Sequence, residues 1–267
     1  MTTTVQTAPA APDAAPRPTD TPGISLGRLV RVELRKAVDT RSGIGLLAAI
    51  LLIDLVAVAI LTFADATSEF GFEGYLAILM NVQFLLLPIV GVIAAAGEWS
   101  QRTTLQTFAL EPRRSRVIAA KVAAALALMV LITIGTVVLA AAGHAVSQAT
   151  GNTTEGWGID PQIALGMLLM LTLVTLMGVA FGLLLHAPAI AIVTFLFLPQ
   201  VFSVLPLLLP NLEGFFSWID FQWAWSALFE DGGPTAGEWA RIASTTAIWV
   251  VAPMVAGWYR TVRREAA

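Results

Sequence analysis

The sequence predicts an all-α integral membrane protein with six transmembrane helices, preceded by an amphipathic helix on the cytoplasmic surface. Of its 267 residues, 57% are hydrophobic and only 12% are charged, about half the charged fraction usual in soluble domains. A soluble fold cannot hide this much apolar surface. The apolar residues also form long runs, and basic residues gather in alternate connections between them. Both patterns are typical of multi-pass membrane proteins.

Six apolar runs of about 20 residues, the length that a helix needs to cross the hydrocarbon core, define the predicted spans. They cover Gly43–Ala64, Tyr75–Ala96, Val117–Ala142, Pro161–Leu185, Pro188–Leu209 and Ile242–Tyr259. The transmembrane domain is therefore expected to occupy residues 42–267. The Thr-, Ala- and Pro-rich residues 1–23 are expected to form a disordered cytoplasmic tail. Three prolines inside spans indicate either kinks or the high proline content of membrane helices: Pro88, Pro199 and Pro206.

The distribution of basic residues predicts the orientation. All but Arg241 of the 15 Lys and Arg residues fall in the N-terminal segment, in the connection between spans two and three, or in the C-terminal tail. Six spans put these three segments on one side, and the connections on the other side are acidic. Because short Lys- and Arg-rich loops stay inside the cell, both termini are expected to be cytoplasmic. The excess of Arg over Lys and the abundance of Ala favour a GC-rich bacterial genome, so the membrane is expected to be a bacterial cell membrane.

Residues 24–41 are predicted to form an interfacial helix before the first span. Apolar residues share one arc of this helix, and basic residues that include Arg35 and Lys36 take the other. Glu33 is the exception, because it falls inside the apolar arc, where it can pair with Lys36 three residues later. The helix is expected either to anchor the chain on an anionic leaflet or to dock a cytoplasmic partner.

The basic connection Gly97–Lys121 has a pattern of its own. A short helix is predicted over Trp99–Leu110 and is ended by Pro112, because proline disfavours a helical conformation in the residue before it. The result is a short rod between two spans, which could pass force from a cytoplasmic partner into the membrane. The alternative is that its arginines only keep the loop inside.

Polar side chains are rare within the predicted spans. Asp54 lies in the middle of the first span, where a carboxylate costs about 2.5–3.5 kcal/mol to insert. It is expected to face the bundle, either as a structural group bonded to a neighbouring helix or as a gating or proton-linked group. Asn81, Gln83 and Gln200 are further polar side chains within the predicted spans, and each can join helices through hydrogen bonds.

The segment Asn211–Glu230, between the fifth and sixth spans, carries seven Phe and Trp residues. This density is unusual for a solvated loop and favours the membrane interface. We expect either an interfacial or re-entrant helix, or an aromatic belt with no gating role.

The basic connection resembles the coupling region of type-two ABC exporter permeases, the ABC-2-like membrane subunits. In that family a span ends in Glu, followed by Arg-(Gly)-Thr, a short helix, Pro, one or two Arg, and a Lys near the next span. The matching positions here are Glu98, Arg102, Thr103, Thr104, Pro112, Arg113, Arg114 and Lys121, and Thr103 stands where the family usually has Gly. The amphipathic helix with Glu33, Arg35 and Lys36, together with the six-span layout, extends the resemblance from Ile24 to the C-terminus.

This resemblance implies the permease subunit of an ATP-driven exporter, with no enzymatic activity of its own. The family pairs two such subunits, identical or paralogous, with two cytoplasmic ATP-binding subunits. ATP would then bind the partner, and this chain, which lacks a G-x-x-x-x-G-K-[ST] loop, would bind no cofactor and no nucleic acid. The family's substrate path makes Asp54, Asn81, Gln83 and Gln200 candidate path residues.

Two other functions are alternatives to export. One is a membrane anchor or assembly protein that transports nothing. The other is an intramembrane enzyme, which would need convergent nucleophiles, bases or metal ligands at the depth of the spans. With no Cys, two His and the single carboxylate Asp54 at that depth, thiol chemistry, metal sites and two-carboxylate catalysis are not expected.

Overall fold

The computed structural model describes residues 24–63, 70–230 and 232–263 and is helical in most of them. Six of its helices are long and apolar enough to cross a membrane. The prediction of an all-α membrane protein is therefore confirmed. The predicted disordered tail, residues 1–23, lies outside the described residues.

The six long helices follow the predicted spans in order. They are α2 (Arg41–Phe63), α3 (Phe72–Ser100), α5 (Arg114–Ala149), α6 (Pro161–Leu185), α7 (Pro188–Leu208) and the continuous run α10 (Ala236–Thr246), π-helical η4 (Ala247–Val251) and α11 (Ala252–Arg263). The shorter elements are α1 (Leu26–Asp39), α4 (Thr104–Leu110), η2 (Pro210–Leu212), α8 (Glu213–Phe216), α9 (Phe221–Ser226) and η3 (Ala227–Phe229).

Several helices extend beyond the predicted apolar runs. With 36 residues, α5 is about 54 Å long at 1.5 Å per residue, well beyond the hydrocarbon thickness of about 30 Å. The sixth run begins at Ala236, where Thr235 and Glu238 form a capping box. Hydropathy detects only the apolar part of such helices, whereas the backbone hydrogen bonds continue into the polar ends. Both α3 and α7 continue as helices through their prolines.

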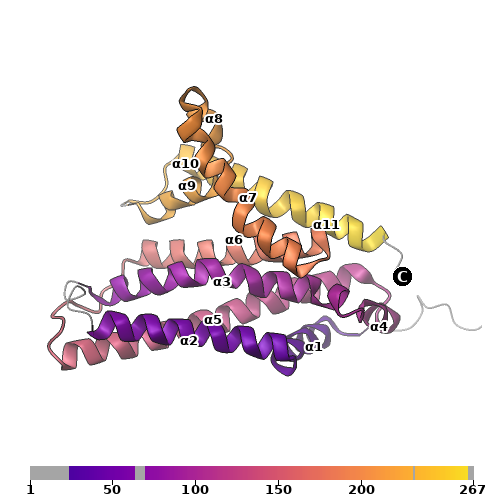
Figure 1. The fold of residues 1–267 in the computed structure, drawn as a ribbon, viewed down its shortest axis with the longest axis horizontal. Coiled ribbons are helices and arrows are strands. Elements are labelled where there is room, and N and C mark those ends of the chain that lie inside the picture. The colour runs from indigo at the N-terminus through magenta and orange to yellow at the C-terminus, as the bar shows by residue number, and fades with distance from the viewer. Residues whose placement is uncertain (1–23, 64–69, 231, 264–267) are drawn as a thin grey trace, which may run out of the picture.

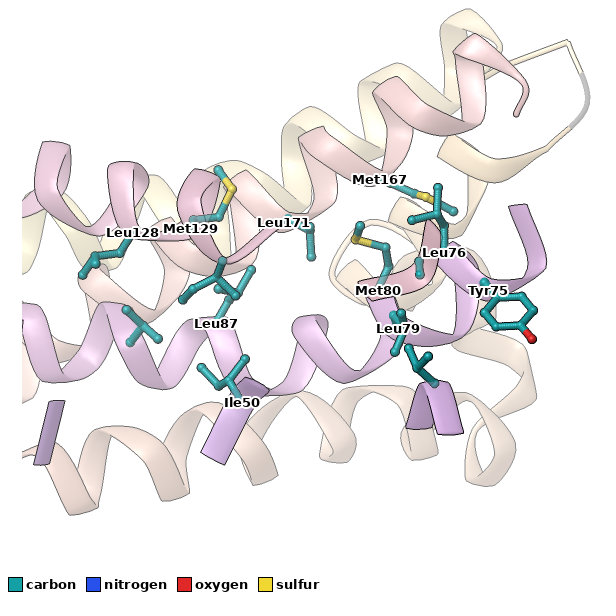
Figure 2. Packing of buried hydrophobic residues seen from close by; sticks show 14 of the residues in the cluster. Ile50, Tyr75, Leu76, Leu79, Met80, Leu87, Leu128, Met129, Met167 and Leu171 are labelled. Atoms are coloured by element: carbon teal, nitrogen blue, oxygen red, sulfur yellow. The ribbon is translucent and has the colours of Figure 1, made fainter. Parts of the chain in front are cut away.

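Figure 1 shows α2, α3, α5 and α6 running alongside one another, while α7 diverges from them toward α8. The centre of the bundle is α3 against α6. In the most apolar window of α6, 61% of residues are buried, against 17% in α7. Leucines, isoleucine and methionines from α2, α3, α5 and α6 form the core between them (Figure 2).

Two glycines let α3 and α6 approach closely. A Cβ atom on Gly178 would lie 2.1 Å from the carbonyl oxygen of Pro88, and one on Gly91 would lie 2.5 Å from that of Thr175. No side chain fits in either position, so these glycines set the spacing of the central helix pair. The rest of the bundle is arranged around this pair.

The aromatic segment forms two short helices and two 3₁₀ turns, not one longer helix. Asp220 ends the first part and caps α9 by accepting hydrogen bonds from the backbone N–H groups of residues 222 and 223. Phe221 and Trp225 are buried against α6 and α10, and the indole N–H of Trp225 donates to the hydroxyl of Thr245 over 3.1 Å. Other aromatic side chains of the segment are exposed, among them Trp223. Three of the seven aromatic side chains, Phe216, Phe221 and Trp225, are buried and serve internal packing.

The chain has one strongly basic end. Here α1, α4, the start of α5 and the end of α11 lie together (Figure 1), and hydrogen bonds join them. Arg114 donates to the carbonyl of Thr261 over 2.9 Å, Arg116 to that of Ile24 over 2.6 Å, and Arg260 to that of Leu184 over 2.5 Å. We call this the basic end.

Candidate functional site

At the basic end, the chain reverses direction between α3 and α4 within three residues. Arg102 has a left-handed backbone (φ 57°), the Thr103 N–H donates to the carbonyl of Glu98 over 3.0 Å, and the Arg102 N–H donates to that of Trp99 over 3.4 Å. This pattern is a Schellman motif, which ends a helix by satisfying its last carbonyls. It turns α4 back against the end of α3.

The reversal corrects the predicted helix Trp99–Leu110. Its first residues belong to α3, and α4 begins only at Thr104, because the left-handed residue Arg102 interrupts the helix. Thr103 has φ −97°, so the position at which glycine was expected from the resemblance needs no glycine here. The left-handed conformation falls one residue earlier, on Arg102.

The other end of α4 follows the prediction. Glu111 is extended (φ −135°) before Pro112, and its N–H donates to the carbonyl of Thr107 over 3.1 Å. The Glu111 side chain is buried and accepts a hydrogen bond from the backbone N–H of Arg113 over 3.3 Å. The short rod is therefore fixed at both ends.

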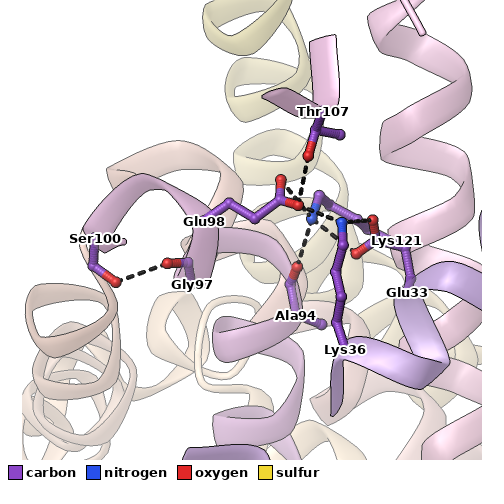
Figure 3. Close-up of polar contacts among 8 residues, drawn as sticks. All are labelled: Glu33, Lys36, Ala94, Gly97, Glu98, Ser100, Thr107 and Lys121. Atoms are coloured by element: carbon purple, nitrogen blue, oxygen red, sulfur yellow. Dashed lines mark hydrogen bonds and ion pairs between the residues drawn. The ribbon is translucent and has the colours of Figure 1, made fainter. Parts of the chain in front are cut away.

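Four charged side chains from three helices meet beside α4 (Figure 3). Lys121 of α5 contacts Glu33 of α1 over 2.9 Å and Glu98 of α3 over 3.1 Å. Lys36 of α1 contacts Glu33 over 2.7 Å and also binds Glu98. Thr107 of α4 donates its hydroxyl to Glu98 over 2.8 Å. We call these five residues the Glu98 cluster.

The Glu98 cluster is nearly closed to solvent. The side chains of Lys121, Glu33 and Glu98 are 6%, 8% and 11% exposed, and only Lys36, at 36%, reaches the surface. Two carboxylates and two ammonium groups cancel in charge, which allows their burial. Burial alone would lower the pKa of Lys36, but the hydrogen bonds and charges of Glu33 and Glu98 outweigh it and raise that pKa above its ordinary value of 10.5.

This arrangement explains why Glu33 lies on the apolar arc of α1. Glu33 does pair with Lys36, as predicted, and it also reaches Lys121, 88 residues away in the sequence. A carboxylate on the apolar arc therefore joins α1 to the bundle. Arg35, in contrast, pairs only locally with the exposed Asp39 in the contacts observed.

The remaining predicted residues of the connection divide into two groups. Thr104 is buried, and Arg114 is fixed by Thr261 and lies 4.7 Å from the ring centroid of Phe108. Arg102, Pro112 and Arg113 are exposed. The first group builds the site, and the second faces outward.

A second polar cluster lies midway along the helices. The carboxylate of Asp54 on α2 accepts hydrogen bonds from Gln83 of α3 and Thr136 of α5, both over 2.7 Å, and Gln83 also contacts Thr136 over 2.8 Å. All three side chains are fully buried. This Asp54 cluster supports the interpretation of Asp54 as a structural group that joins helices.

The structure does not bring the other predicted path residues to this cluster. Asn81 is exposed and donates to the carbonyl of Ala77 in its own helix over 2.8 Å, and Gln200 is exposed on α7. Sequence reasoning missed Thr107 and Thr136. The only signal for Thr136 was a hydroxyl at a depth where the Asp54 carboxylate needs a donor, and threonine is too common in membrane helices for that signal to stand out. Thr107 lies on α4, outside the long helices, and its contact with Glu98 depends on how α4 turns back against α3.

Within the described ranges, no three His, Asp or Glu side chains gather in a way that could hold a metal ion. No protein-family model matches the chain, and a search of curated proteins finds no match to it. The structure therefore shows a multi-pass membrane protein with two buried polar clusters, one of which contacts a short surface helix.

Proposed function

We propose that the chain is the permease subunit of an ATP-driven exporter of the ABC-2-like class, with a partner ATP-binding subunit docking on α4. The observation that carries the proposal is the hydrogen bond from Thr107 to Glu98, because it links the surface helix α4 to a cluster that also holds α1 and α5. A load applied to α4 has a direct route into three other helices.

The outward face of α4 supports docking. Leu105 and Leu110 are 51% and 76% exposed, although they lie outside the six long helices. Exposed leucines on a short, well-fixed helix are suited to a groove on another protein. The exposed Arg102 and Arg113 flank them and would orient an acidic partner surface.

The orientation completes the proposal. With the basic end in the cytoplasm, as the Lys and Arg distribution predicts, α4 faces the compartment that contains ATP. Closure of the ATP-binding subunits would push α4, and the Glu98 cluster would convert the push into tilting of α3 and α5 relative to α1. The substrate would then gain access alternately from the two sides of the membrane.

The test uses the full-length chain, expressed with the ATP-binding subunit encoded by a neighbouring gene. Leu110→Glu places a charge on the proposed docking face, and Leu212→Glu makes the same change at a 46% exposed leucine far along the chain, in η2. We expect Leu110→Glu to abolish co-purification and ATP hydrolysis in vesicles, whereas Leu212→Glu retains both. Both variants should unfold at the temperature of the wild type.

The proposal fails if the Leu110→Glu chain still binds the ATP-binding subunit, or if the wild-type chain never does. In the second case, the alternative of an anchor or assembly protein without transport would be favoured.

A further inference from the structure

We propose that a cavity beside the Glu98 cluster is a binding site for one phospholipid, with the phosphate at the rim and an acyl chain inside. The cavity has a volume of about 300 Å³ and lies between α1, α2, α3, α4 and α5. This size is at the lower end of the range for ligand sites in proteins. The proposal does not depend on the function proposed above.

The lining of the cavity changes from polar to apolar, and its polar part includes the Glu98 cluster with the largely buried side chains of Glu33, Glu98 and Lys121. Its rim includes the exposed residues Ser42, Gln101 and Gln106. Its floor includes Ala124 and Leu128, which are 1% and 6% exposed. Aliphatic side chains form the walls between them: Leu46, Leu47, Val90 and Ile93.

This gradient selects an amphipathic occupant. A water-soluble ligand would bury polar groups against the aliphatic floor, and a wholly apolar ligand would cover the rim amides without bonding them. The apolar walls come from the beginning of α2 and the end of α3, where these helices reach the basic end. A lipid of the leaflet at that end would have its headgroup and chain at the matching depths.

The charges favour a phosphate at the rim. The four charges of the Glu98 cluster cancel, so the cluster does not repel an anion. Lys36 lines the cavity, is 36% exposed, and gives two of its three N–H donors to Glu33 and Glu98. Its third donor can bind a phosphate oxygen, and the exposed Arg41 and Arg102 lie next to the rim residues in sequence.

Photolabelling of the purified full-length chain tests the site directly. The probe is phosphatidylglycerol with a diazirine on one acyl chain, in vesicles, followed by peptide mass spectrometry. Probe molecules in the lipid around the bundle label exposed side chains such as Val138, but a probe reaches the buried Leu128 only by entering the cavity. We expect labelling of both residues, and absence of label from Leu128 in the wild type would overturn the proposal.

A matched pair of variants sharpens the result. A Cβ on Gly97 meets only a methyl group of Ile93 at 3.8 Å, so Gly97→Leu fills the cavity, whereas Gly45→Leu adds the same side chain to α2 where no atom lies within 4 Å. We expect Gly97→Leu to remove the label from Leu128, and Gly45→Leu to retain it. Equal labelling of Leu128 in both variants would contradict the proposal. If Gly97→Leu does not fold, the wild-type labelling decides.

A second probe tests the headgroup. Diacylglycerol with the same photoreactive chain lacks the phosphate, so we expect it to label Leu128 several-fold less than phosphatidylglycerol does. Equal labelling by both probes would show that the cavity takes a chain without recognising a phosphate, and would overturn that part of the proposal.

Discussion

The Glu98 cluster and the Asp54 cluster both join α3 and α5 to an earlier helix, but they are built differently. At the basic end, two carboxylates meet two ammonium groups and a hydroxyl. Midway along the bundle, one carboxylate meets an amide and a hydroxyl, with no cation among its contacts. The same helices therefore carry an ionic junction at one end and a hydrogen-bonded junction in the middle.

The difference shows how each junction can respond to load. Opposite charges attract over distances longer than a hydrogen bond, so an ionic junction tolerates small shifts of its helices. A hydrogen bond weakens steeply with distance and angle, so the Asp54 cluster fixes one geometry. We infer that the bundle is held at Asp54 and adjusts around Glu98, which is where α4 is attached.

Removing the central acid of the ionic junction should have the largest effect. Glu98→Ala leaves the buried Lys121 and its neighbour Lys36 with Glu33 alone, and we expect it to lower the free energy of unfolding by about 3–5 kcal/mol. Unfolding in mixed detergent micelles measures this loss. Glu155→Ala, at an exposed acid, is the control and should change little. A loss under about 1 kcal/mol for Glu98→Ala would show that the cluster is not a junction.

Removing the acid of the hydrogen-bonded junction should lower the free energy of unfolding less. Asp54→Ala removes two interhelical hydrogen bonds but leaves the contact between Gln83 and Thr136, so we expect a loss of about 1–2 kcal/mol by the same measurement. Asp54→Asn keeps an acceptor oxygen and should recover most of the stability that Asp54→Ala loses. If Asp54→Asn were fully stable yet abolished transport, Asp54 would be a path residue and the structural interpretation would be wrong.

The attachment of α4 gives a smaller change in stability and a clear change in function. Thr107→Val removes one hydrogen bond to Glu98, for a loss of about 1 kcal/mol. If the chain works as the proposed permease, its ATP-binding subunit should remain bound to this variant while transport falls. Thr172→Val is the matched control, because that hydroxyl bonds only within α6. Unchanged transport in Thr107→Val would exclude this bond as the route of coupling.

The smallest expected effect is a pH dependence. The raised pKa of Lys36 means that its stabilisation is fully present below pH 10.5 and is lost as pH rises through the higher folded value. Raising the pH from 9 to about 11.5 should therefore lower the stability of the wild type more than that of Lys36→Met, as measured by thermal unfolding. Because Lys36 is partly exposed and faces both Glu33 and Glu98, the difference should be small. Parallel curves for the two proteins would contradict it.

The sequence predicted the helices well and the clusters only in part. Apolar runs identify the six long helices because hydropathy is a local property of each segment. The local pair between Glu33 and Lys36 could be predicted from helix geometry. The contacts of Glu98 with Lys36 and of Lys121 with Glu33 join residues 62 and 88 positions apart, so they depend on how α1, α3 and α5 pack. No local pattern encodes that packing.

Two other predictions show the same limit. Gln83 was expected to be able to join helices and does so, but Asn81 and Gln200, chosen on the same grounds, are exposed. Residue type alone could not tell which side of α3 or α7 faces the bundle. The helix Trp99–Leu110 was predicted too long because an arginine does not indicate a left-handed backbone, which Arg102 adopts. A glycine at this position would have indicated it.

The three-residue reversal between α3 and α4 bears on how this protein can change over time. The backbone of this connection itself satisfies the end of α3, so the connection has no spare length. An inserted residue would break the Schellman hydrogen bonds and rotate α4, which would move Thr107 away from Glu98. Insertions and deletions should therefore be rejected here. Natural variants of this chain should keep a constant number of residues from Glu98 to Thr107.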